Sequence, residues 1–156
     1  MSDQRPASLS MTVLMTPDMS NFAGNVHGGS ILKLLDQVAY ACASRYAGTY
    51  VVTISVDRVL FHQPIHVGEL VTFFASVNYT GHTSMEIGIR VETENVRDGE
   101  RRHTNSSYIT MVAVDDTGKS CAVPPLEPSD AVARARFDAA RRRRRAFREA
   151  AEATTH

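Results

Sequence analysis

One carboxylate, Asp36, interrupts a segment that is otherwise almost entirely apolar and that begins at two adjacent glycines, Gly28 and Gly29. A carboxylate in such a place can serve as a general base or as a nucleophile. The glycines would let a reacting group approach the first amides of a helix, whose unpaired N–H groups stabilise negative charge. The plainer alternative is an ion pair with Lys33, three positions before Asp36, or a contact with another structural partner. The pattern therefore predicts either a catalytic carboxylate or a carboxylate that makes a structural contact.

The elements that would position these residues follow from the hydrophobic pattern and the turn signals. A long apolar run rich in alanine predicts a helix over Ser30–Tyr46. Stretches rich in β-branched and aromatic residues predict strands, with breaks at Pro64, at Gly81 and at Asp98-Gly99. These strands are expected at residues 9–15, 50–61, 69–81, 83–96 and 102–116. A last segment without glycine or proline, residues 130–151, predicts a second helix.

The order of these elements predicts the fold class. The first helix is apolar nearly all round, so it should be buried on most of its faces. One strand before it and four after it can form a long antiparallel sheet that wraps around it. We therefore expect an α+β protein with a hotdog-like fold, formed by residues 1–126. Residues 127–156 are expected to be an arginine-rich helical tail on the surface or against a neighbouring subunit.

Composition indicates an ordinary soluble protein of 156 residues, with 43% hydrophobic and 22% charged residues. The first residues lack a signal-peptide pattern and no apolar run reaches about 18 residues, so we expect a cytoplasmic protein that does not bind a membrane. Cys42 and Cys121 are expected to be reduced thiols. The histidines are scattered across turns and strand ends and do not form the i, i+4 pair of a helical metal site, so no metal is expected.

The basic residues gather at the end of a chain whose net charge is zero: eight of the seventeen arginines and lysines follow Pro125. The run Arg141–Arg145 can be a solvated helix face, a site for phosphate groups or a nucleic-acid contact. Nucleic acid is the weakest of these interpretations because the run lacks interleaved aromatic residues that would stack on bases.

Three blocks of sequence resemble one known family. The blocks "GNVHGGSILKLLDQVA", "TISVDRVLFHQPIHVGELV" and "GHTSMEIGIRVETE" occur in order and with natural spacing. They are similar to the acyl-CoA hydrolase branch of the hotdog-fold thioesterases. The resemblance implies hydrolysis of a fatty acyl-CoA to a free fatty acid and CoA, with no cofactor beyond the CoA of the substrate. It also implies a homodimer that assembles further, typically into a homohexamer built as a trimer of dimers.

The resemblance also implies roles for individual residues. Asp36 matches the catalytic carboxylate, and Asn25 matches its partner across the dimer interface. Ile54, Ser55 and Val56, together with Thr83, Ser84 and Met85, match segments that contact CoA. From their place at the helix start, His27, Gly28 and Gly29 are expected to stabilise the oxyanion or bind substrate. The resemblance carries no catalytic role onto His27, which is better explained as a hydrogen-bonding loop residue.

The spacing of Asp36 from the glycines favours a site shared between two subunits. Eight residues of helix separate Asp36 from Gly28, roughly 12 Å along the axis, whereas reacting groups must meet within about 3.5 Å. Antiparallel helices in a two-fold dimer would bring Asp36 of one chain towards Asn25 and Gly29 of the other. Asp36 can then act as a general base on water or attack directly to form an anhydride.

Two other functions fit the same fold. A hotdog hydratase or dehydratase would act on acyl thioesters without releasing thiol. A non-catalytic acyl-CoA-binding protein would use the same cleft, and its arginine tail would engage nucleic acid. The presence of both Asn25 and Asp36 favours the hydrolase. Acyl-chain length and the choice between tetramer and hexamer are left open.

Overall fold

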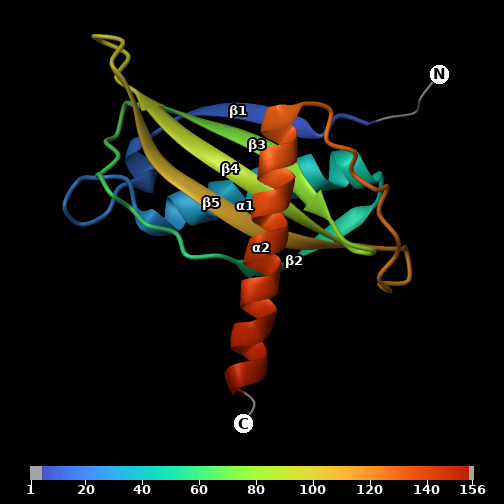
Figure 1. Cartoon of the computed structure of the whole chain (residues 1–156). Helices are drawn as coiled ribbons and strands as arrows, with labels where there is room; N and C mark the ends of the chain where they lie inside the picture. The colour runs from blue at the N-terminus through green and yellow to red at the C-terminus, as the bar shows by residue number, and fades with distance from the viewer. Residues whose placement is uncertain (1–4, 155–156) are drawn as a thin grey trace.

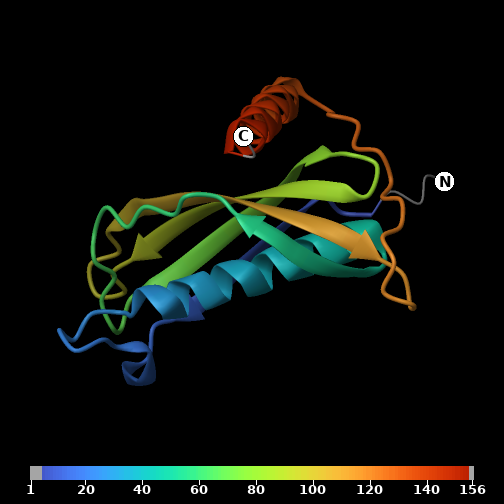
Figure 2. The same cartoon turned by 90° about the horizontal axis from the view of Figure 1, so that it is seen from below.

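The computed structural model describes residues 5–154, which form one antiparallel sheet with a helix on each side (Figures 1 and 2). The first helix, α1, spans Gly28–Ala47, the second, α2, spans Ala131–Thr154, and a short 3-10 helix covers Pro17–Met19. The strands are β1 (Ser8–Leu14), β2 (Tyr50–Val56), β3 (Leu70–Thr80), β4 (Ser84–Glu94) and β5 (Arg101–Val114). The expected α+β hotdog arrangement is confirmed.

The five strands follow the order β1-β3-β4-β5-β2, and all four pairings are antiparallel. The central strands β3, β4 and β5 follow one another along the chain as a meander. Its first turn contains Gly81, and its second is closed at Gly99, whose φ of 75° favours glycine. Strand β2 lies at one edge of the sheet and β1 at the other, so each has one unpaired side in a single chain.

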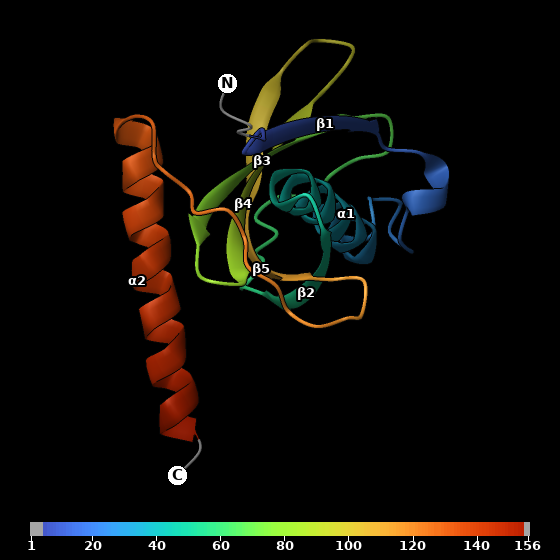
Figure 3. The same cartoon turned by 90° about the vertical axis from the view of Figure 1, so that its right-hand side faces the viewer.

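Helix α1 lies in the curl of the sheet and packs against all five strands (Figure 3). His27 precedes the helix and its side chain caps the first turn, and Gly48 follows the helix in the left-handed conformation. The face towards the sheet carries fully buried residues such as Ile31, Leu35 and Val38. The opposite face is exposed, which the near-continuous apolar pattern does not predict for a single chain.

Helix α2 crosses the other, convex face of the sheet (Figure 3). Ala140 is fully buried, and the ring of Phe137 packs against that of Tyr79 with centroids 4.9 Å apart. Arg143 donates two hydrogen bonds to the carboxylate of Glu86. An aromatic contact and a part-buried ion pair thus help to attach a helix with little apolar surface.

Strand β2 is shorter than the sequence pattern predicts, because it ends at Val56 and not at Phe61. The amide of Asp57 still donates to Tyr108 of β5, at 2.9 Å. The next amide, of Arg58, bonds the Asp57 side chain instead, and this local bond turns the chain away from the sheet. Leu60 and Phe61 consequently lie in an irregular segment with half-exposed side chains.

The thiol of Cys42, on the buried face of α1, lies in the core, and this burial raises its pKa to about 11. Such a thiol stays protonated and unreactive at neutral pH. No helix formed by residues 5–154 combines the length and the apolar character needed to cross a membrane.

Changing Gly88 to alanine should destabilise the fold. A Cβ atom at this position of β4 would lie 2.2 Å from Nδ2 of Asn78, which is only 5% exposed and accepts a hydrogen bond from Ser76. We expect the free energy of unfolding to fall by about 1 to 3 kcal/mol, the usual cost of overpacking. Denaturant unfolding measures it. Adding Asn78→Ala should recover part of the loss, whereas wild-type stability for Gly88→Ala would contradict the packing described.

Candidate active site

Asp36 lies on the exposed face of α1 and is held by a threonine of the neighbouring edge strand. The hydroxyl of Thr53 donates a hydrogen bond of 2.6 Å to Oδ1 of Asp36. The ion pairs among residues 5–154 do not include one between Asp36 and Lys33. A single hydroxyl donor leaves the second carboxylate oxygen available to a proton or a substrate atom.

At the start of α1, one backbone amide is free to donate a hydrogen bond and the next one already donates to a side chain. Nδ1 of His27 accepts a hydrogen bond of 2.9 Å from the amide of Gly29. A Cβ at position 29 would lie 3.1 Å from the same nitrogen, so a larger residue there would require a small shift of the His27 ring. No hydrogen bond within residues 5–154 uses the amide of Gly28. Gly28 is therefore the free donor at the helix start, and Gly29 becomes one only if the His27 ring moves.

The loop before the helix is built around two asparagines. Oδ1 of Asn21 accepts hydrogen bonds from the amides of Ala23 and Asn25, at 2.9 and 3.1 Å. Oδ1 of Asn25 lies 3.0 Å from Nδ1 of His66, and the two residues also form a backbone bridge. The loop is thus fixed internally by Asn21 and tied to the β2–β3 connection by Asn25.

The turn that carries His66 is itself anchored by a part-buried ion pair. The amide of His66 donates to Oε1 of Glu69 at 2.7 Å, and Arg102 contacts the same oxygen at 2.8 Å. Arg102 also donates to the carbonyl of Pro64. Asn25 therefore rests against a rigid support.

Within one chain the two halves of the predicted site stay apart. Within residues 5–154, no hydrogen bond or ion pair of Asp36 reaches the Asn21–Asn25 loop or the helix start, and its hydrogen-bond partner is Thr53. Leu32 and Tyr40 flank Asp36 on α1 and are about 40% exposed, at 41% and 39%. Ile54 on the edge strand is 61% exposed. Apolar residues around a carboxylate, beside an unpaired strand edge, are typical of a surface that another chain covers.

The segments expected to contact CoA meet at a cavity of about 570 Å³ between the sheet and α2. Ile54, Ser55, Val56 and Met85 line it together with residues of α2. Ser84 lies beside it and accepts a hydrogen bond of 2.6 Å from Arg144. Thr83 does not line the cavity, and its carbonyl accepts the amide of Ala113.

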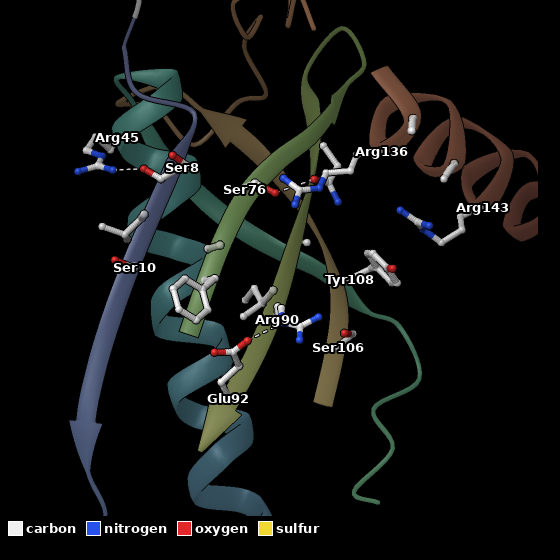
Figure 4. Close-up of a pocket in the computed structure, with 18 residues that line it drawn as sticks. Ser8, Ser10, Arg45, Ser76, Arg90, Glu92, Ser106, Tyr108, Arg136 and Arg143 are labelled. Carbon is white, nitrogen blue, oxygen red and sulfur yellow. Dashed lines mark hydrogen bonds and ion pairs between the residues drawn. The ribbon is translucent and has the colours of Figure 1, made fainter. Parts of the chain in front are cut away.

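A larger cavity, of about 1070 Å³, lies further along the convex face and contains none of the residues predicted for the site (Figure 4). Arg136 and Arg143 reach from α2 towards the sheet there, and the guanidinium of Arg143 lies 3.6 Å from the ring centre of Tyr108. Arg90 and Glu92 form an ion pair on its floor.

Three residues near these sites were not predicted from the sequence. Thr53 could not be predicted, because its contact with Asp36 joins a strand to a helix. Asn21 belongs to the same polar loop as Asn25 and carried no distinguishing signal. Arg144 lay in a run recognised as basic, but nothing in the sequence indicates which arginine faces the sheet.

The antiparallel sheet curled around α1 defines a hotdog-fold protein. The chain belongs to the thioesterase superfamily, whose family model matches residues 23–100.

Two relatives illustrate the range of similar proteins. Protein VdlD of Helicobacter pylori is 48% identical over 136 residues, which cover 87% of this chain and 78% of that protein. The human cytosolic acyl coenzyme A thioester hydrolase is 35% identical over 131 residues, which cover 83% of this chain and 34% of that protein.

Solved structures agree with the fold. A hexameric acyl-CoA thioesterase in its apo form superimposes with a TM-score of 0.88 at 35% identity, covering 92% of both chains. The acyl-CoA hydrolase of Staphylococcus aureus, solved with butyryl coenzyme A, coenzyme A and coenzyme A disulfide, gives a TM-score of 0.84 at 32% identity and covers 95% of this chain and 92% of that one. Alanine variants of the S. aureus enzyme are known at an asparagine, an aspartate and a threonine, positions 28, 43 and 60 of that protein.

Proposed function

We propose that this protein is a thioesterase that hydrolyses fatty acyl-CoA to a free fatty acid and CoA in the cytoplasm. The observation that carries the proposal is the Asp36 carboxylate, exposed on α1 and oriented by the Thr53 hydroxyl at 2.6 Å. The names of the human and S. aureus relatives support the substrate class, and the human name supports the location.

The intervals between the altered residues of the S. aureus enzyme support a set of three residues here. Its asparagine, aspartate and threonine, at positions 28, 43 and 60, are separated by 15 and 17 positions. In this chain Asn21, Asp36 and Thr53 are separated by the same 15 and 17 positions. The comparison favours Asn21 as the counterpart of that asparagine. Asn25, which the sequence resemblance predicts for the role, stays a second candidate four residues further on.

In the proposed hydrolysis the carboxylate, the backbone amide and the asparagine each have one role. Asp36 removes a proton from water, which attacks the thioester carbonyl carbon, and the thiolate of CoA leaves. The amide of Gly28 donates to the oxygen on which negative charge develops. An asparagine of the same loop orients the water or the carbonyl. In the variant mechanism Asp36 attacks directly and water then cleaves the anhydride.

We place this site between two subunits. Asp36 would come from one chain, and the Asn21–Asn25 loop with Gly28 from its partner, because eight helical residues separate them within a chain. The exposed edge of β2 and the apolar face of α1 would form the dimer contact. The hexameric state of a structural neighbour supports a trimer of dimers as the full assembly.

The competing hypothesis is a hydratase, which adds water to the double bond of an unsaturated acyl thioester without cleaving the thioester bond. The two enzyme hypotheses are distinguished by giving the protein butyryl-CoA and a 2-enoyl-CoA and measuring free thiol and hydrated product. Thiol release from butyryl-CoA supports the thioesterase. Hydrated product without thiol would replace it with the hydratase.

Replacing Thr53 by valine should slow hydrolysis while leaving the fold intact. Valine keeps the shape and the strand preference of threonine but removes the hydroxyl that orients Asp36. We expect kcat to fall about 10-fold, in line with the loss of a hydrogen bond to a charged group, and KM to stay near its wild-type value. Thr53→Ser restores the hydroxyl and should recover most of kcat. Equal rates for the valine and serine variants would remove Thr53 from the site.

A further inference from the structure

The chain that leaves β2, residues 57–63, runs alongside β5 without belonging to the sheet. Val56 is the last residue of β2 and pairs with Ile109 of β5. The next contact in the same register is a backbone hydrogen bond of 2.9 Å, which the amide of Asp57 donates to the carbonyl oxygen of Tyr108. From there to residue 63, side chains of β5 hold the segment in place.

Two side chains of β5 supply these contacts. Nδ2 of Asn105 donates a hydrogen bond of 2.9 Å to the carbonyl oxygen of Leu60. Arg102 donates to Oε1 of Gln63 at 3.0 Å. Asn105 is only 3% exposed, and a buried amide group costs free energy unless it is hydrogen-bonded. Its bond to Leu60 meets this need and fixes the backbone one residue before Phe61.

The anchored segment places the ring of Phe61 against the start of α1. A Cβ atom on Gly28 would lie 3.7 Å from both Cε2 and Cζ of that ring, which is ordinary van der Waals contact. The amide of Gly28, on the same Cα atom, donates no hydrogen bond within residues 5–154 and is the proposed oxyanion donor. The ring of Phe61 is therefore a direct neighbour of this donor within one chain.

The other side of the ring is available to a substrate. The side chain of Phe61 is 48% exposed, although one edge of its ring contacts α1. An oxyanion donor lies about 2.7 to 3.1 Å from the carbonyl oxygen, and the carbonyl bond adds about 1.2 Å. The carbonyl carbon of a bound thioester thus lies within about 4 Å of the Gly28 amide, and the carbon next to the carbonyl is one bond further. The Phe61 ring borders the space that this carbon enters.

We propose that Phe61 selects acyl groups that are unbranched next to the carbonyl. This role rests on the proposed function and adds a specificity-determining residue to the half of the site that contains Gly28. A straight chain lies along the exposed side of the ring, whereas a methyl branch on the carbon next to the carbonyl needs space that the ring fills. A hydrophobic wall discriminates one such carbon by about 10- to 200-fold. Straight-chain acyl-CoAs are then preferred over branched ones of the same size.

The test compares butyryl-CoA with isobutyryl-CoA, which have the same atoms and differ only in branching. The measured quantity is the ratio of their kcat/KM values, so comparing proteins cancels the lower intrinsic reactivity of the branched thioester. Phe61→Ala should lower the butyryl-to-isobutyryl ratio by about 10-fold or more relative to the wild type. Phe61→Leu keeps an apolar side chain of intermediate size and should lower it less. Leu60→Ala is the matched control, since Leu60 is 50% exposed in the same segment, and should leave the ratio within about 2-fold.

The outcomes separate this role from the proposed function. An active Phe61→Ala protein with the wild-type ratio overturns the selection by Phe61 while the thioesterase stands. An equal change in Leu60→Ala also overturns it, because loosening of the segment would then explain the effect. If the wild type releases thiol from neither substrate, the proposed function fails and the role of Phe61 fails with it. Should Phe61→Ala fail to fold, Phe61→Leu decides the question by the same ratio.

Discussion

Asp36→Asn should abolish most of the thioesterase activity while leaving the protein folded. Asparagine keeps the size of the side chain and an oxygen that can accept the Thr53 hydroxyl, but it cannot take a proton from water. Loss of a general base typically slows a reaction by about 10² to 10⁴-fold, and we expect kcat to fall by that factor. Initial rates of thiol release from butyryl-CoA measure it.

The control for this variant is its stability. Asp36 is exposed, and exposed substitutions away from special contacts usually change stability by less than about 0.5 kcal/mol. The melting temperature of Asp36→Asn should therefore match that of the wild type. A variant that melts normally and still hydrolyses butyryl-CoA at the wild-type rate would remove Asp36 from the chemistry.

A mixture of two inactive variants should regain activity. In a shared site, one chain supplies Asp36 and its partner supplies Asn21, so Asp36→Asn and Asn21→Ala each remove one of the two groups. A dimer of one chain of each variant then has one site with both changes and one site with neither. After subunit exchange of equal amounts, half of the dimers are mixed and half of their sites are intact, so about a quarter of the wild-type activity should return.

Each variant exchanged with wild type gives the control for subunit exchange itself. The same experiment with Asn25→Ala in place of Asn21→Ala identifies which asparagine acts. A site contained within one chain makes the opposite prediction, because no chain in the mixture carries both intact residues. Activity that stays at the level of the separate variants, despite demonstrated exchange, would contradict the shared site.

Much of the fold could be predicted because each strand carries its own local signal. Alternating β-branched residues and the breaks at Gly81 and Asp98-Gly99 place the β3–β5 meander within a residue or two of its observed ends. The end of β2 could not be predicted, since residues 57–61 keep a strand-like composition and only the Asp57 side-chain bond turns the chain away. Local propensity does not reveal which backbone amide is diverted.

The candidate site could be predicted only in part, because some of its contacts join different elements. Asp36 stood out because a carboxylate in an apolar helix needs an explanation, and this signal lies in one segment. Its bond to Thr53 joins residues 17 positions apart across a helix and a strand, so it exists only in the folded chain. His27 likewise carries a cap on Gly29 that its type alone does not reveal. Contacts between elements decide these roles, and sequence patterns describe elements singly.

Thiol release from a series of saturated acyl-CoAs of increasing chain length, followed with the wild-type protein, tests the central claim most directly. The account predicts many turnovers per active site, with free CoA and the fatty acid appearing in equal amounts. Because catalysis is assigned to Asp36 and not to a contaminating hydrolase, release should disappear in Asp36→Asn prepared in parallel. No release from any chain length, or equal release from both proteins, would contradict the assignment of this chain as a thioesterase acting through Asp36.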